Sequence, residues 1–298
     1  MRLRSTAPRR AAGLLAATVL TASALAGCAS TADTAADPAA SPTAGETAKD
    51  CAAKATLTAP GKLTVGTDSP AYEPWFSDDD PTNGKGFESA VAYAVADRLG
   101  FAEDAVSWTK VRFNTSYAPG AKPFDFDINQ ISITPARQKA VDFSDGYYAA
   151  AQAVIALKGS KAASITSLAD LKDLRLGAQT GTTSLTAIRD GIQPTTEASV
   201  FQDTNAAKQA LQNGQVDAIL ADLPTAFYIT AVEIPKGTIV GQFQPTTGQQ
   251  EEFGLLAAKG SSLTPCLDLA LAELKADGTL AGLEKQWLSD VVDVPVLQ

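Results

Sequence analysis

The sequence contains no histidine. The usual metal ligand and the usual proton shuttle at neutral pH are therefore both missing. Neither a Ser-His-Asp triad nor a Cys-His pair can be built from this chain. The composition thus speaks against an enzyme without excluding one, and we predict neither a cofactor nor a metal ion.

Basic residues are also scarce, because 24 Lys and Arg stand against 33 Asp and Glu, a net charge of -9. A nucleic-acid-binding domain would carry a basic footprint, so we predict no nucleic-acid partner. Hydrophobic residues make up 45% of the 298 positions, which is enough for a sizeable core. Such a chain forms two domains of ordinary size or one large one.

The amino terminus is typical of an export signal. Residues 1–10 carry four arginines and no acid, and the uncharged, alanine-rich run 11–27 follows. This run is slightly short for a transmembrane helix. It ends in "LAGC", which looks like a bacterial lipobox and implies cleavage before Cys28 and lipidation of its thiol. The alternative is a plain signal peptide with a chance cysteine. We predict a lipoprotein signal peptide over residues 1–27 and a protein anchored by lipid to the extracellular face of the cell membrane.

The segment after Cys28 contains almost nothing that can form a core. Residues 29–50 include no aromatic residue and no aliphatic one larger than alanine, so they cannot offset the entropy of becoming ordered. We predict that residues 28–56 form the lipidated cysteine and a flexible tether. For the remaining cysteines, Cys51 and Cys266, we predict a disulfide, because an exported protein meets oxidising conditions; the alternative is two free buried thiols.

The body of the chain alternates predicted strands and helices. Strands are expected at 62–68, 124–133, 150–159 and 252–260. Helices are expected at 86–100, where apolar residues recur every four positions, and at 263–288, broken at Asp277-Gly278. Two further stretches combine these elements: 167–190 reads as helix, strand, Gly-Thr turn and helix, and 204–229 as helix, Asn-Gly turn, strand and helix. This order predicts an α/β fold with mostly parallel sheets, whose ligands lie beyond the carboxyl ends of the strands.

Seven stretches, in order over roughly residues 60–290, resemble the extracellular solute-binding proteins of polar amino-acid ABC transporters. They are "LTVGTD" with the later Tyr, Glu, Pro and Trp, "GFESAVAYAVADRLG", "DINQISITPARQKAVDFSDGYY", "LRLGAQTGTTS", "GQVDAILADLP", "EEFGLLAAKG" and "LAELKADGTLAGLEKQW". The resemblance implies a type II periplasmic-binding-protein-like α/β fold, with a cleft between two lobes and a two-strand hinge. Lobe 1 is then expected at 57–150 and 255–298, and lobe 2 with the hinge strands at 151–254.

The resemblance also implies which residues bind the two charged groups of an amino acid. Arg137, in "SITPAR", corresponds to the arginine that binds the α-carboxylate, which a guanidinium grips with two hydrogen bonds. Asp222, in "LADLP", corresponds to the acid that pairs with the α-ammonium. Ser132, Thr182 and Thr183 match further ligand-binding positions. The alternatives are that Arg137 is a structural charge, and that Asp222 and the two threonines only cap helices.

The ligand's side chain is expected to meet Asp68, Tyr72, Trp75, Phe113 and Gln130, by the same resemblance. The aromatic residues of this set are equally compatible with a core. Asn114 is a further candidate. An acid together with amides favours a polar or cationic ligand side chain. The stretch 108–127, which contains Phe113, departs from the family's pattern through two prolines and added aromatic residues.

The expected function is to capture an amino acid outside the cell, as a monomer, and to deliver it to the permease subunits of an ABC transporter. Two alternatives stay open. One is an exported dehydratase on the same fold, with Asp68 or Glu73 as the acid/base group. The other is a sensory module that signals through a partner.

Overall fold

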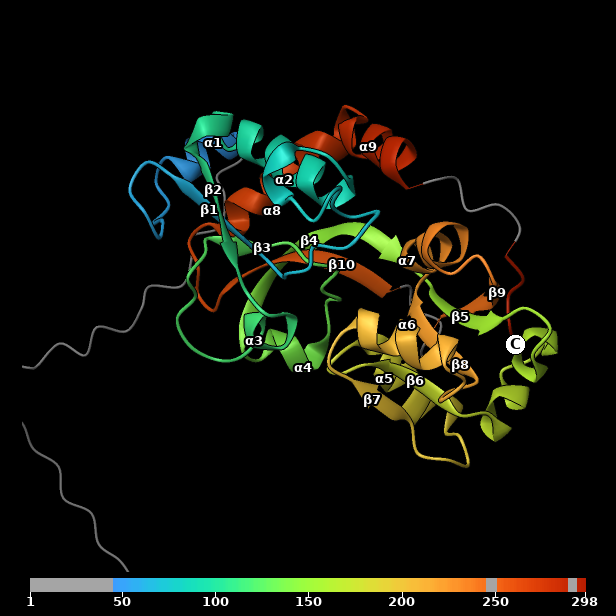
Figure 1. Ribbon diagram of the computed structural model, residues 1–298. Coiled ribbons are helices and arrows are strands. Elements are labelled where there is room, and N and C mark those ends of the chain that lie inside the picture. Colours follow the sequence, from blue (N-terminus) through green and yellow to red (C-terminus); the bar gives the residue numbers. More distant parts are fainter. Residues whose placement is uncertain (1–44, 245–250, 289–293) are drawn as a thin grey trace, which may run out of the picture. The chain divides into compact units, whose positions relative to one another are not determined.

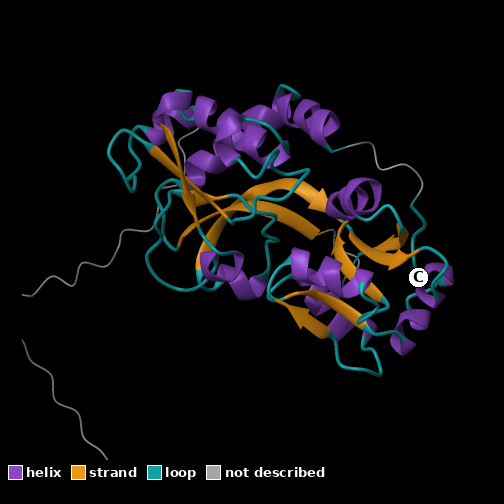
Figure 2. Ribbon diagram, in the orientation of Figure 1, coloured by secondary structure: helices purple, strands orange, loops and turns teal. Residues whose placement is uncertain are grey.

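The computed structural model describes residues 45–244, 251–288 and 294–298 (Figures 1 and 2). The predicted signal peptide, Cys28 and the first part of the predicted tether lie outside these residues. No helix within the described ranges combines the length and the apolar character needed to cross a membrane.

The strands form two five-stranded sheets. The first has the order β2-β1-β3-β10-β4, from Val106–Lys110, Leu63–Thr67, Phe126–Asp127, Glu251–Ala258 and Val141–Ala150. The second has the order β7-β6-β8-β5-β9, from Ser199–Phe201, Leu176–Gln179, Ala218–Asp222, Gln152–Leu157 and Gly237–Phe243. We call the first sheet with its helices lobe 1, and the second sheet with its helices lobe 2.

Both sheets are mixed, so the prediction of mostly parallel sheets was wrong. Strand β1 pairs in parallel with β2 and β3, whereas β10 runs antiparallel to β3 and β4. In the second sheet β5 runs antiparallel to both β8 and β9. The antiparallel strands are those at which the chain passes between the lobes. Strand β4 ends at Ala150 and β5 begins at Gln152, so only Ala151 separates the two sheets there.

Helices cover both faces of the sheets. In lobe 1, the helices α1 (Ala48–Ala52), α2 (Phe87–Arg98), α8 (Thr264–Ala276) and α9 (Thr279–Trp287) share one apolar core, and the short helices α3 (Phe113–Ser116) and α4 (Pro135–Gln138) lie on the cleft side. In lobe 2, α5 (Thr183–Thr186) packs on one face, and α6 (Thr204–Gln212) and α7 (Leu223–Tyr228) pack on the other. Strand β5 is buried on both sides, because its alternate residues enter two different cores.

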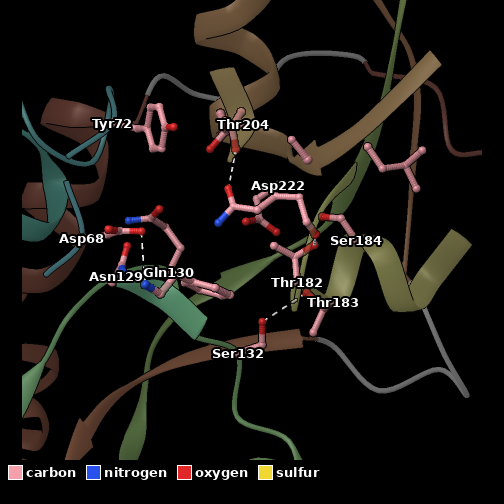
Figure 3. Close-up of a pocket in the computed structure, with 15 residues that line it drawn as sticks. Asp68, Tyr72, Asn129, Gln130, Ser132, Thr182, Thr183, Ser184, Thr204 and Asp222 are labelled. Carbon is pink, nitrogen blue, oxygen red and sulfur yellow. Dashed lines mark hydrogen bonds between the residues drawn. The ribbon is translucent and has the colours of Figure 1, made fainter. Parts of the chain in front are cut away.

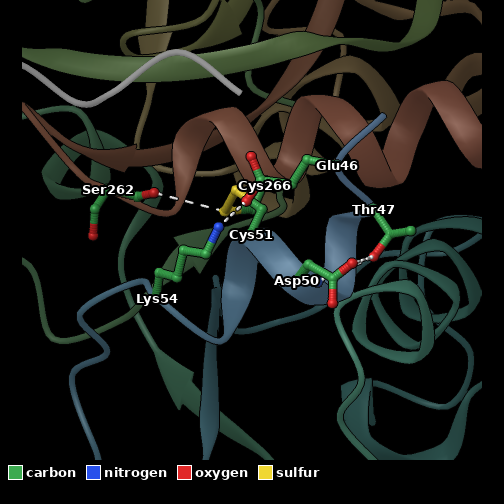
Figure 4. A network of polar contacts seen from close by, with 7 residues as sticks. All are labelled: Glu46, Thr47, Asp50, Cys51, Lys54, Ser262 and Cys266. Carbon is green, nitrogen blue, oxygen red and sulfur yellow. Dashed lines mark hydrogen bonds and ion pairs between the residues drawn. A yellow bond between two sulfur atoms is a disulfide. The ribbon is translucent and has the colours of Figure 1, made fainter. Parts of the chain in front are cut away.

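Residues 45–56 are not a flexible tether, as the sequence led us to expect. Thr47 caps helix α1 by accepting a hydrogen bond from the backbone of Asp50, and Ala48 and Ala52 enter the core of lobe 1. A disulfide joins Cys51 of α1 to the buried Cys266 of α8 (Figure 4). The covalent link and the two small apolar side chains together attach this segment to lobe 1.

The carboxyl-terminal residues also differ from the prediction, which placed 255–298 in lobe 1. The backbone of Gln242 in β9 donates to Pro295 and accepts from Leu297, at 2.8 and 2.9 Å. The Leu297 side chain lies in a core of lobe 2. Residues 294–298 therefore belong to lobe 2. Conversely, all of β10 from Glu251 onward pairs within the sheet of lobe 1, although residues 251–254 were expected with lobe 2.

The predicted strand at 124–133 is reduced to β3, two residues long. Gln130 has a left-handed φ of 46°, which an extended strand cannot contain. The chain therefore turns away from the sheet after Asp127. This turn carries Asn129 and Gln130 into the space between the lobes.

Candidate functional site

A pocket lies where strands of both sheets end at their carboxyl termini (Figure 3). Lobe 1 contributes Asp68 after β1 and the turn after β3, and lobe 2 contributes the start of α5 and the end of β8. The lining residues are Asp68, Tyr72, Phe113, Asn129, Gln130, Ser132, Gln179, Thr182, Thr183, Ser184, Thr204, Leu220, Ala221, Asp222 and Thr225. The polar turns that the sequence places after strands thus meet at one site.

One amide binds two carboxylates beside the pocket, those of the lining residue Asp222 and of Glu251. Gln152, the first residue of β5, donates from one amide nitrogen to Asp222 at 2.8 Å and to Glu251 at 3.1 Å. Its amide oxygen accepts from Ser184. Burial raises the pKa of Asp222 well above the ordinary value of an aspartate, and the nearby charge of Glu251 raises it further. A cation placed here would relieve both effects.

Glu251 also joins the two lobes. Its other carboxylate oxygen accepts hydrogen bonds from the hydroxyls of Ser132 in lobe 1 and Thr183 in lobe 2. These two hydroxyls lie 3.3 Å apart. The three side chains form one polar connection across the cleft.

Arg137 lies next to the pocket and is 8% exposed. Its two terminal nitrogens donate to the backbone carbonyls of Ser132 at 2.7 Å and Gly181 at 2.9 Å, one in each lobe. The guanidinium carbon lies 4.6 Å from the ring centre of Tyr117 and 5.5 Å from that of Phe113. Burial lowers the pKa of this guanidinium, whereas Tyr117 and Glu251 raise it. The arrangement places a desolvated positive charge between the lobes.

Comparisons with known proteins agree with this geometry. The sequence model of the bacterial extracellular solute-binding proteins, family 3, matches residues 63–290. The chain belongs to this family. An L-cystine-binding protein of Escherichia coli (strain K12) is 29% identical over 232 residues, which cover 76% of this chain and 82% of that protein. An ABC transporter glutamine-binding protein of Bacillus subtilis (strain 168) is 31% identical over 217 residues, 70% of this chain and 76% of that protein.

The fold is likewise that of the family's solved structures. The structure of an ancestral arginine-binding protein bound to glutamine has 32% sequence identity and a TM-score of 0.66, and the match covers 78% of this chain and 100% of that one. The two sheets described above are accordingly the two lobes of a type II binding protein.

Most of the predicted ligand-binding residues of this solute-binding protein lie in the pocket. Eight of the ten line it, namely Asp68, Tyr72, Phe113, Gln130, Ser132, Thr182, Thr183 and Asp222. Thr182 does so as a helix cap, because its hydroxyl accepts from the backbone of Leu185 and donates to that of Gln179. Asn114, the further candidate, is not among the lining residues. Its side-chain oxygen accepts from the hydroxyl of Tyr117.

Arg137 and Trp75 are the two that do not line the pocket. Arg137 borders the pocket, because it donates to the backbone of the lining residue Ser132 and to that of Gly181, which directly precedes the lining residue Thr182. That Arg137 binds a carboxylate stays a prediction. Trp75, which was also predicted to contact the ligand, does not line the pocket. Its side chain is fully buried in an aromatic cluster of lobe 1, 5.4 Å from Tyr148 between ring centres, and its indole nitrogen donates to Thr225 at 2.8 Å. Trp75 thus supports a lining residue of lobe 2 without reaching the pocket.

Sequence reasoning missed several residues of the site. Glu251 stands in a predicted hinge strand, where no motif distinguishes it from the neighbouring acid Glu252. Asn129 lies inside the predicted strand 124–133, directly before the candidate Gln130, and this neighbour was the available signal. Gln179, Ser184 and Thr204 also line the pocket. Within the described ranges, no group of three or more potential ligands is placed to hold a metal ion.

The segment 108–127, which departs from the family's pattern, packs two aromatic rings against the guanidinium of Arg137. Phe113 begins helix α3, and Tyr117 follows it, so both rings lie against the guanidinium. The hydroxyl of Tyr117, which lies 2.9 Å from the side-chain oxygen of Asn114, also lies 3.3 Å from the carbonyl oxygen of Gly181 in lobe 2. The added aromatic residues therefore contribute to the contact between the lobes.

Proposed function

We propose that this protein binds a polar amino acid in the pocket between its lobes and delivers it to the permease of an ABC transporter, without performing a chemical reaction. Its relatives are named for binding cystine, glutamine and arginine, which are all amino acids with polar side chains. A monomer is sufficient for this role, because each chain contains the whole pocket.

The observation that carries the proposal is the pairing of opposite charges around one pocket. Asp222 of lobe 2 and Glu251, at the start of β10, provide acidic groups on one side, and Arg137 of lobe 1 provides positive charge. An α-amino acid is a zwitterion with matching groups a short distance apart. Its ammonium stabilises the charged form of Asp222 and so lowers the raised pKa of that carboxyl. Its carboxylate accepts from Arg137 in place of one of the backbone carbonyls.

The first experiment is thermal unfolding of the purified protein with each of the twenty amino acids at millimolar concentration. A ligand that binds only the native state raises the unfolding temperature with the logarithm of its concentration. We expect one or a few polar amino acids to do so. No shift with any amino acid would overturn the proposal.

The second experiment assigns the two charges. Calorimetry compares the best ligand with its analogue that lacks the α-carboxylate and its analogue that lacks the α-ammonium. Arg137→Ala is expected to lose roughly 3–5 kcal/mol of binding for the amino acid, because it leaves a buried carboxylate unpaired, but to bind the decarboxylated analogue unchanged. Asp222→Asn is expected to show the reverse pattern, with the loss confined to ligands that carry the ammonium. Equal losses for all three ligands would mean that these residues only hold the lobes in place.

We propose further that Cys28 carries a lipid that anchors the protein to the outer face of the membrane. The proposal rests on the apolar run that ends in "LAGC". The chain from Cys28 to the start of the described residues supplies a tether. Fractionation of cells producing the wild type and Cys28→Ser checks it. The wild type is expected with the membrane and the variant in the soluble fraction, whereas membrane association of both would exclude this anchor.

A further inference from the structure

Asn129 presents a buried amide to the pocket without a partner in the protein. It is 7% exposed, it lines the pocket, and its Nδ2 has no hydrogen-bond partner within the described residues. A buried donor left without a partner is costly, so native structures rarely contain one. The acceptor for this donor is therefore expected to come with the ligand.

The neighbouring amides are already oriented by the protein. Gln130 donates from its backbone, at 2.7 Å, and from its side chain to the two carboxylate oxygens of Glu88, which fixes its Nε2 away from any ligand. Gln179 accepts at its Oε1 from the hydroxyl of Thr204, at 2.9 Å. Of the three amides that line the pocket, Asn129 is the one whose donor nitrogen is buried without a hydrogen-bond partner among the described residues.

Asp68 supplies the opposite function in the same pocket. Its two carboxylate oxygens accept from the backbone nitrogens of Ser69 at 2.7 Å and Phe113 at 3.2 Å, and each oxygen can accept a further hydrogen bond. The pocket therefore offers a ligand side chain a buried donor without a partner, at Asn129, and a charged acceptor, at Asp68.

Few side chains satisfy both groups. A guanidinium or an ammonium has donors only, and would leave the Asn129 donor unpaired. A carboxylate would accept from Asn129 but would stand against the negative charge of Asp68. A carboxamide has an oxygen for Asn129 and an NH₂ group for Asp68.

We infer that the ligand is an amino acid with a carboxamide side chain, glutamine or asparagine, and that Asn129 selects it against the cationic amino acids. The inference rests on the proposed function, since it concerns the side-chain end of the same amino-acid site. A site built to form a hydrogen bond discriminates strongly against ligands that cannot form it.

The test is calorimetric titration of the purified protein with glutamine, asparagine, arginine, lysine and glutamate. The wild type is expected to bind one carboxamide about 10- to 100-fold more tightly than either cation, the range that one unpaired buried donor produces. Asn129→Asp replaces the donor with an acceptor. The affinity of this variant for the carboxamide ligand is therefore expected to fall by at least about tenfold, and its affinity for arginine or lysine to rise. Asn129→Leu removes the donor without adding charge, and is expected to lose the carboxamide without that gain.

The matched control is Asn213→Asp, which adds the same charge at an exposed position outside the pocket and should leave every affinity unchanged. If the wild type prefers arginine or lysine, or if Asn129→Asp keeps the wild-type ranking, the inference is wrong while the proposed function stands. If no amino acid binds at all, the proposed function itself fails. Should Asn129→Asp not fold, the wild-type ranking and Asn129→Leu decide the outcome.

Discussion

A single buried carboxylate holds one wall of the pocket in place. Glu88, in helix α2, is fully buried and accepts hydrogen bonds from the backbone and side chain of Gln130 and from the hydroxyl of Tyr147. Three donors on one carboxylate compensate part of its desolvation. They also stabilise the left-handed backbone of Gln130, a residue that lines the pocket. Glu88 thus links the core of lobe 1 to the shape of the site.

The titration of Glu88 should make stability depend on pH. Burial raises the pKa of Glu88 to about 7 from the 4.5 of a free glutamate, although the hydrogen bonds from Tyr147 and Gln130 lower it. Between these two values the folded protein holds a proton that the unfolded chain has lost. The free energy of unfolding therefore falls as the pH rises from 4.5 through 7, by on the order of 3 kcal/mol for a shift of this size.

Urea unfolding at pH 5 and pH 7.5 measures this fall. We expect Glu88→Gln, which cannot titrate, to show a smaller difference between the two pH values than the wild type. Part of the difference should remain, because burial also raises the pKa of the nearby Asp127. The exposed Glu103 provides the control, and Glu103→Gln should behave as the wild type does. A wild-type pH dependence that survives intact in Glu88→Gln would show that Glu88 does not titrate in this range.

At the scale of elements, patterns that depend on local sequence were predictable. Helix α2 follows from its apolar residues at every fourth position, and the break between α8 and α9 follows from Asp277-Gly278. Most of the pocket was found because strand ends and short motifs are local as well. The elements that were missed depend on distant partners. The alanines of α1 become core residues because they pack near Cys266 and α8, which lie more than 200 positions further along the chain. Glu251 becomes a site residue because it lies where the chain crosses between the lobes.

Local pattern also fails where a tertiary contact overrides it. Residues 124–133 alternate apolar and polar side chains as a strand does, but Glu88 captures the backbone and side chain of Gln130 and ends the strand early. Trp75 has the motif of a ligand contact, but an aromatic cluster from three other elements encloses it. In both positions the deciding partner is far away in the sequence, so no reading of the neighbouring residues reveals it.

At the scale of the whole molecule, the two lobes meet closely at Gly181. Its carbonyl accepts from Arg137 of lobe 1 and lies 3.3 Å from the hydroxyl of Tyr117, also of lobe 1. A Cβ added at this glycine would lie 2.1 Å from the side-chain oxygen of Asn114 and 2.3 Å from the hydroxyl of Tyr117. Tyr117 cannot easily yield, because its ring packs against the guanidinium of Arg137. A side chain at position 181 would therefore keep the lobes apart.

We expect Gly181→Ala to weaken ligand binding by at least about tenfold, which corresponds to about 1.4 kcal/mol. The reason is that a ligand held by both lobes can keep its contacts with both only if the lobes come close together at position 181. The matched control is Gly159→Ala. Both glycines have a positive φ, 74° and 76°, so both variants carry the same backbone strain, but nothing lies within 4 Å of a Cβ at Gly159. Calorimetry should find wild-type affinity in Gly159→Ala and a loss of affinity in Gly181→Ala, with similar decreases in unfolding temperature.

Adding Asn114→Ala and Tyr117→Phe to Gly181→Ala removes both clashing groups and should restore part of the affinity. If the two alanine variants bind equally well, the contact at Gly181 does not limit closure, and the affinity of this solute-binding protein is set within the pocket alone.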